Sequence, residues 1–114
     1  MTTTSQPRPG EHAYNRLNLT YARVQLRNLR DAADRHRQVD PELADRVHRL
    51  AEGALYHAER LELLLAYRLI DTAADATRAA DGALTEPTLR AWRATELAAC
   101  DHYGTDLVYA ANPR

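Results

Sequence analysis

The chain has 114 residues, enough for one small domain with a modest core but too few for a dinucleotide-binding domain beside it. All 15 basic residues are arginines, set against 16 acids. The net charge of −1 gives no overall positive field of the kind that nucleic-acid-binding proteins usually carry. The apolar fraction is 45%, mostly Leu and Ala, which favours helices over sheets. The absence of Lys and Phe beside many Ala and Arg indicates the codon usage of a GC-rich bacterial genome.

Cysteine usage and hydropathy bear on location. The single Cys100 allows no internal disulfide, which predicts a reducing, cytoplasmic setting. The most apolar stretch, residues 61–70, is only ten residues long and carries Glu62 and Arg68. It is too short and too charged to span a bilayer, so we expect no membrane association.

The N-terminal part of the chain predicts a tail followed by a helix. Residues 1–12 include two prolines and one glycine among polar residues, and we expect a flexible tail there. A single helical domain then covers residues 13–110. Its first helix is predicted to run from Ala13 to Gln38.

The next segment, "VDPEL", carries a strong signal for the start of a second helix. Asp40 suits the N-cap, Pro41 the first helical position, and Glu42 the first turn, where its charge meets the helix dipole. No stop signal follows until Gly82, so one long central helix is predicted over residues 42–81. If it is kinked, we expect the kink near Asp71 and Thr72, where the apolar residues thin to alanine.

The third helix is predicted from Glu86 to Tyr103. Thr85 is the expected N-cap, Pro87 lies in the first turn, and Gly104 ends the helix. The remaining residues add at most one further turn.

Apolar side chains surround two of these helices. Residues 61–70 place them in nearly every direction, and the first helix carries the stripe Leu17, Tyr21 and Val24 almost opposite a second apolar stripe. A helix that is apolar all round must be covered all round. We therefore expect an all-α bundle of three main helices that is completed by self-association, most simply as a homodimer. The predicted interface residues are Leu26, Leu29, Leu63, Leu64, Tyr67 and Ile70.

The sequence contains no complete motif for a metal or cofactor site. His57-Ala58-Glu59 spells the H-x-E half of a zinc deaminase signature, but that chemistry needs two further thiolates and the chain has one cysteine. Glu-x-x-His spacing, typical of metal sites in helix bundles, is absent. The one-turn pair His48 and Glu52 lies on a predicted solvated ridge. We predict neither a functional metal site nor a bound cofactor.

A polar cluster in the core is the candidate ligand site. Glu96 shares a helix face with Trp92 and Tyr103, and His57 lies near the apolar stripe of the central helix. Because a buried carboxylate needs a partner, we predict that Glu96 and His57 meet, together with a Tyr hydroxyl. Two interpretations stay open: the cluster fixes packing, or it is a ligand pocket or acid/base pair.

Arginines along the first helix form a ridge that has two interpretations. The ridge comprises Arg16, Arg23, Arg27 and Arg30, and the central helix carries an acidic ridge that includes Glu52 and Glu59. The two ridges face each other across a hairpin or a dimer interface, or the arginines contact an anion or nucleic acid.

Residues 83–93, "ALTEPTLRAWR", resemble the turn and recognition helix of the MerR-type helix-turn-helix. The resemblance implies that Thr88, Arg90 and Arg93 contact DNA and that Trp92 packs behind them. It covers eleven residues and departs from the family pattern in two ways. Asp75 stands where an apolar residue is expected, and the segment lies near the C-terminus.

Three functions follow from these features. The leading hypothesis is a non-enzymatic binding or assembly module that acts through its helix surfaces as a homo-oligomer, or with a protein partner. The first alternative is a ligand-binding bundle or small enzyme that uses His57 and Glu96. The second is a DNA-binding regulator that uses residues 83–93, although a nucleic-acid partner is not expected from the charge.

Overall fold

The computed structural model describes residues 9–80 and 82–111, with the side chains of residues 17–80 and 82–110. This part of the chain consists of helices joined by short turns and contains no strand. The tail expected over residues 1–12 lies largely outside it, and the first helix begins at Pro9, earlier than predicted. The helices are α1 (Pro9–Arg35), the short 3-10 turn η1 (His36–Gln38), α2 (Pro41–Glu59), α3 (Leu63–Ala80), α4 (Thr85–Tyr103) and α5 (Thr105–Ala111).

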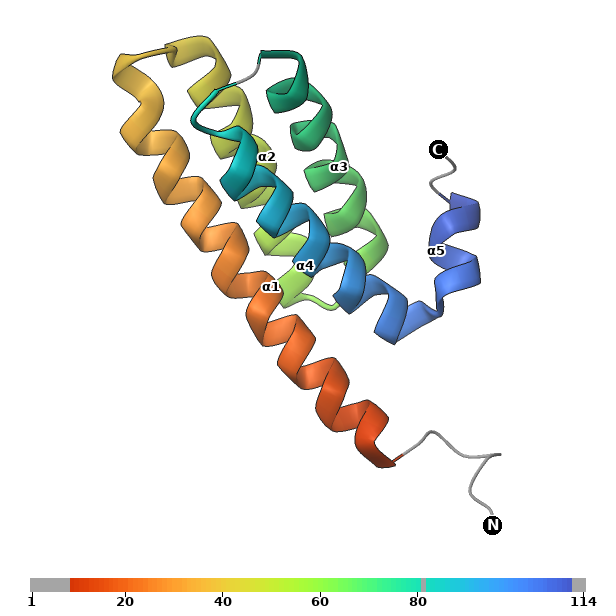
Figure 1. Ribbon diagram of the computed structural model, residues 1–114. Helices are drawn as coiled ribbons and strands as arrows, with labels where there is room; N and C mark the ends of the chain where they lie inside the picture. The colour runs from red at the N-terminus through yellow and green to blue at the C-terminus, as the bar shows by residue number, and fades with distance from the viewer. Residues whose placement is uncertain (1–8, 81, 112–114) are drawn as a thin grey trace.

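The first four helices form an up-and-down bundle joined by short turns (Figure 1). α1 packs against α2 and α4, and α3 packs against the same two helices from the other side. Short connections make consecutive helices antiparallel neighbours. The first turns of α1 project beyond the bundle, and α5 turns back from the end of α4 (Figure 1).

Two of the predicted helix ends are confirmed. The Asp40 carboxylate accepts a hydrogen bond of 3.1 Å from the Leu43 N–H, and Pro41 opens α2. Gly104 ends α4 with a φ of 97°, where its N–H donates to the Cys100 carbonyl over 2.8 Å. That φ is the left-handed region which glycine enters without steric cost.

The predicted cap of α4 is wrong. The N-cap is Leu84, which makes no side-chain capping bond. The Thr85 hydroxyl instead accepts from the Gly82 N–H over 3.2 Å and donates to the Thr77 carbonyl over 3.3 Å. Thr85 therefore ties the α3–α4 turn to the end of α3.

The prediction of a single central helix is also wrong, because a turn separates α2 from α3. Leu61 adopts a φ of 63°, the Leu61 N–H bonds to the Ala58 carbonyl over 3.0 Å, and the Glu62 N–H bonds to the His57 carbonyl over 2.8 Å. This pair of bonds is a Schellman motif, in which the left-handed residue is usually glycine. The break lies ten residues before the kink expected near Asp71. It turns the predicted three main helices into four, followed by the short α5.

Alanine supplies more than half of the buried apolar residues. Small side chains let the helices approach closely, as where α2 meets α3. A Cβ atom on Gly53 would lie 3.0 Å from Cδ1 of Leu69. The larger side chains of the core come mainly from α1 and α3.

Five of the six residues predicted to form a dimer interface belong to this core of one chain. Leu26, Leu29, Leu63, Tyr67 and Ile70 are buried, and Leu64 is partly buried. The reason is the break at Leu61, which folds α3 back along α2 and supplies the cover that self-association was expected to give. These side chains therefore do not form a surface for a second copy. Within the described part of the chain, no helix is long and apolar enough to cross a membrane.

Candidate functional site

Glu96 on α4 is the centre of a polar cluster between α3, α4 and α5. Its carboxylate is only 13% exposed and accepts a hydrogen bond of 3.2 Å from the Tyr67 hydroxyl. Arg93 Nε lies 3.7 Å from the other carboxylate oxygen, and Tyr109 of α5 lies close enough to Glu96 to interact with its charge. The negative charge of Glu96 raises the pKa of Tyr109 above its ordinary value. A tyrosine hydroxyl does meet Glu96, as expected.

Trp92 and Tyr103, the other predicted ligand residues on α4, also make bonds between elements. Trp92 Nε1 donates to the Asp71 carboxylate over 2.8 Å, and its ring centroid lies 6.0 Å from that of Tyr67. The Tyr103 hydroxyl accepts from the Leu63 N–H over 3.3 Å and donates to the Leu61 carbonyl over 3.4 Å. Tyr103 thereby satisfies an otherwise unpaired N–H at the start of α3.

His57 lies at a different site from Glu96. Its Nδ1 is 2.9 Å from Oε1 of Glu62, and its ring makes an edge contact with Tyr56. The prediction that His57 pairs with Glu96 is wrong, because the turn at Leu61 brings Glu62 back beside His57. The described side chains contain no group of three or more residues able to hold a metal ion.

The arginine ridge faces the acidic ridge across the α1–α2 hairpin. Arg27 lies 3.5 Å from Glu59, and Arg30 lies 3.8 Å from Glu52. Of the two other ridge members, Arg23 is partly buried and the side chain of Arg16 lies outside the described residues. The first of the two interpretations of the ridge, complementary faces within a hairpin, therefore holds for Arg27 and Arg30.

The contact between α1 and α2 continues toward their connecting turn as a network of charged side chains. His48 Nδ1 lies 2.9 Å from the Asp34 carboxylate, and His48 Nε2 lies 3.5 Å from Glu52. Arg37 bonds to Asp34 over 2.8 Å and also pairs with Asp45. The hydrogen bond from Arg37 is the main reason that the pKa of Asp34 lies below its ordinary value.

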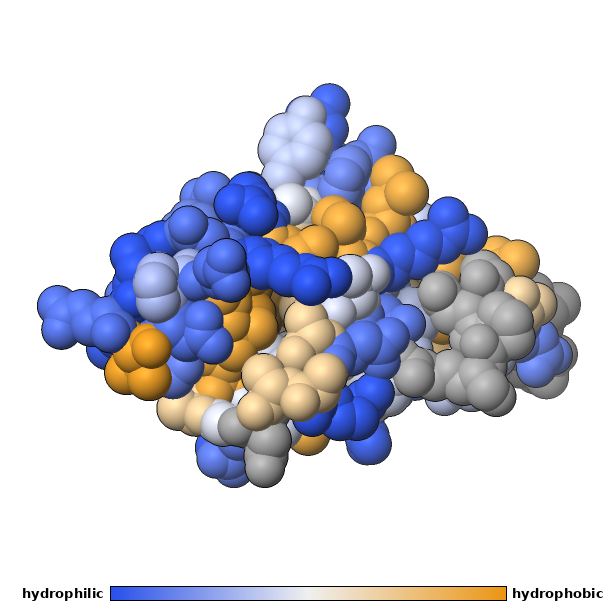
Figure 2. Space-filling view, turned by 90° about the horizontal axis from the view of Figure 1, so that it is seen from above, coloured by the Kyte–Doolittle hydropathy of each residue, from blue (hydrophilic) through white to orange (hydrophobic). Residues whose placement is uncertain are grey.

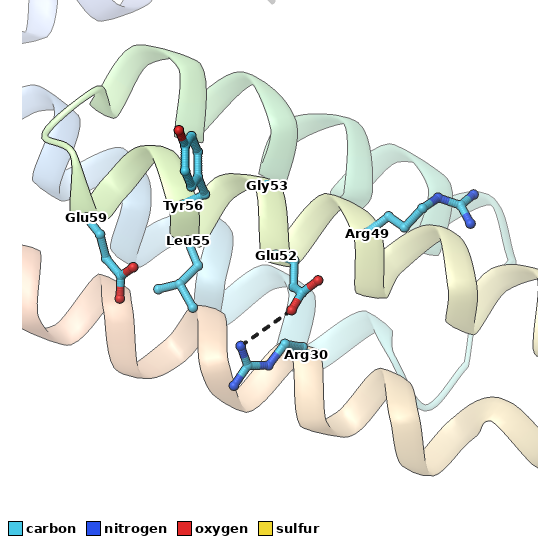
Figure 3. Close-up of a pocket in the computed structure, with 7 residues that line it drawn as sticks. All are labelled: Arg30, Arg49, Glu52, Gly53, Leu55, Tyr56 and Glu59. Carbon is cyan, nitrogen blue, oxygen red and sulfur yellow. Dashed lines mark ion pairs between the residues drawn. The ribbon is translucent and has the colours of Figure 1, made fainter.

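An open groove of about 600 Å³ lies over α2, beside these charged contacts with α1 (Figure 3). The ion pair of Arg30 with Glu52 spans it, whereas the side chains of Arg49 and Tyr56 point away from that pair (Figure 3). Opposite charges that already neutralise each other, without convergent polar groups, make a poor ligand site. We assign no ligand to the groove.

Residues 83–93, which resemble part of a helix-turn-helix, form the α3–α4 turn and the first part of α4. Thr88 is fully buried, and its hydroxyl donates to the Leu84 carbonyl over 2.5 Å, so it is not available to DNA. Arg90 pairs with Glu86 over 3.0 Å and Arg93 with Glu96. α3 and α4 run side by side along the bundle (Figure 1) rather than crossing at the 90–120° of that motif.

The outer face of α1, which we define as Leu17, Thr20, Tyr21, Val24 and Asn28, is exposed along its length. Leu17 is 69% exposed, Tyr21 50% and Val24 39%. Thr20 and Asn28 are also exposed, so this face carries no ionised group over about three turns. The sequence did reveal this stripe, but we expected it to be covered and placed the interface elsewhere.

Several exposed apolar residues on the other helices have charged neighbours. Leu89 and Leu97 on α4 flank the exposed Arg93, and the guanidinium of Arg60 lies 5.1 Å over the Tyr56 ring. Figure 2 shows the same mixture on the face seen from above, where hydrophilic side chains border the apolar patches. Single exposed hydrophobic residues are normal on protein surfaces, whereas large contiguous apolar patches mark interaction sites.

The comparisons with known proteins supply no relative. No family model, no curated protein and no solved structure matches the chain.

Proposed function

We propose that the chain is a non-enzymatic assembly module that pairs with a second copy of itself through the outer face of α1. The observation that carries the proposal is the exposure of Leu17, Tyr21 and Val24 along one side of a helix. Their spacing of four and three residues is that of a helix-pairing seam. Fully burying one exposed apolar side chain of this size contributes about 1.5–3 kcal/mol, and a dimer would cover the exposed part, about half, of three such side chains from each copy.

The chemistry of this face favours a second copy as its partner. A two-fold contact places a surface against itself, so a face of one charge sign would repel its own copy. The outer face of α1 carries no charge between Leu17 and Val24, and Arg27 at its edge already pairs with Glu59. The net charge of −1 adds little repulsion between copies.

Sedimentation velocity across a range of concentrations tests the proposal. We expect a dimer for the natural chain and a monomer for Tyr21→Glu, which would bury two carboxylates against apolar side chains. The matched control is Leu89→Glu, the same change at an exposed apolar position of α4, which should remain a dimer. Far-UV circular dichroism should show equal helicity for all three proteins.

Two results would overturn the proposal. One is a natural chain that stays monomeric up to about 1 mM, where even a weak dimer would be populated. The other is a dimer that Tyr21→Glu leaves intact, which would place the contact on another surface.

A further inference from the structure

We infer that the two copies pair with their α1 helices antiparallel, about a two-fold axis that passes beside Thr20 and Tyr21. This inference rests on the proposed function and specifies how the same face is used. Residues 20 and 21 lie midway between Leu17 and Val24, the ends of the exposed stripe. An antiparallel pair with its axis there places Leu17 of each copy against Val24 of the other, so that both stripes are covered along their whole length.

The charges beyond the stripe decide between antiparallel and parallel pairing. The outward side of α1 continues from Asn28 to Asp31 and Arg35, which are both exposed. In a parallel pair each of these residues would face its own copy, and like charges placed opposite each other destabilise a contact. In the antiparallel pair the two Asp31 side chains lie roughly 30 Å apart along the axis, at 1.5 Å per residue. That separation exceeds the Debye length of about 8–10 Å at ordinary ionic strength, so the repulsion is screened.

The helix dipoles favour the same arrangement. α1 is 27 residues long, and its positive N-terminal end would lie beside the negative C-terminal part of the partner helix. The projection of α1 beyond the bundle (Figure 1) leaves the N-terminal half of the stripe accessible to a second copy.

Disulfide crosslinking from single cysteines tests the arrangement. In a Cys100→Ser background, the variants Leu17→Cys, Tyr21→Cys and Val24→Cys are oxidised alone and in mixed pairs, with one member of each pair carrying an affinity tag. We expect Tyr21→Cys to crosslink with itself. Leu17→Cys and Val24→Cys should crosslink with each other and not with themselves, because Val24 lies about 10 Å along the axis from its own copy. A disulfide needs Cα atoms within about 7 Å.

A parallel pair gives the opposite pattern. Leu17→Cys and Val24→Cys would then each crosslink with themselves, and the mixed pair would not form. That result overturns the antiparallel inference and leaves the proposed function standing. A monomer in sedimentation with no crosslink from any variant overturns both, and a dimer with no crosslink overturns the use of this face. Crosslinks from Arg46→Cys, an exposed residue of α2, give the background from random collisions.

Discussion

The Tyr67 hydroxyl on α3 donates a hydrogen bond of 3.2 Å to the carboxylate of Glu96 on α4, a side chain that is only 13% exposed. A hydrogen bond to an ionised group contributes about 1.5–3 kcal/mol to stability. Tyr67→Phe keeps the ring in the core and removes only the hydroxyl. We expect the free energy of unfolding in urea to fall by about that amount. Tyr56→Phe, at a half-exposed ring, is the matched control, and an equal effect of the two changes would mean that the Tyr67 bond contributes nothing.

Leu61 holds a left-handed conformation in the α2–α3 turn, which for a residue with a side chain carries a penalty of roughly 1–2 kcal/mol. Leu61→Gly removes this strain, and the higher entropy of glycine in the unfolded chain offsets part of the gain. We expect a net stabilisation of about 1 kcal/mol in urea unfolding. Arg60→Gly, one residue earlier at a φ of −97°, relieves no strain and should destabilise. A loss of stability in Leu61→Gly would show that the leucine side chain matters more than its backbone.

Asp34 should make the unfolding free energy depend on pH in the acid range. The pKa of its carboxyl is held below 3.8, mainly by the hydrogen bond from Arg37. The folded chain thus binds this proton less tightly than the unfolded chain does, so the stabilisation is complete above pH 3.8 and is lost as the pH falls through the lowered pKa. The difference in unfolding free energy between the natural chain and Asp34→Asn should therefore shrink below pH 3.8. A difference that stays constant with pH would contradict this assignment.

Val108 anchors α5 to the bundle. It is the one fully buried side chain among residues 105–110, while Leu107 beside it is half-exposed. Cys100, near the end of α4, is partly buried, and burial raises the pKa of its thiol. Val108→Ala should release α5 by local unfolding, and the rate at which Cys100 reacts with a disulfide reagent should rise severalfold. Leu107→Ala is the control and should react at the natural rate; if Val108→Ala does too, α5 does not protect the thiol.

The helix ends show how far the sequence can predict this fold. Asp40, Pro41 and Gly104 act through local chemistry, and the structure confirms each of them. The turn at Leu61 follows no such signal, because leucine is a strong helix former and a poor left-handed residue. It is held by contacts that are distant in sequence, such as the bond from the Tyr103 hydroxyl to the Leu61 carbonyl. Without that turn, the prediction had one helix in place of α2 and α3. The apolar faces that these two helices bury against the bundle were then expected to be uncovered.

The candidate site was predictable to the same extent. A partly buried Glu96 needs a donor, and a tyrosine hydroxyl provides it. The choice of His57 as a further partner failed because it assumed that α2 and α3 were one straight helix. The exposed stripe on α1 was visible in the sequence, but only the packing shows which of the two stripes on that helix the bundle covers.

The alanine-rich interior has a thermodynamic consequence. A buried alanine withdraws little apolar surface from water, so a core made largely of alanine leaves a small margin over the chain entropy lost on folding. Association that favours the folded state adds to that margin by mass action. If two copies pair as proposed, folding and dimerisation are linked equilibria, and the melting temperature should rise with protein concentration. The amount of this protein that a cell makes would in that case set the fraction of it that is folded.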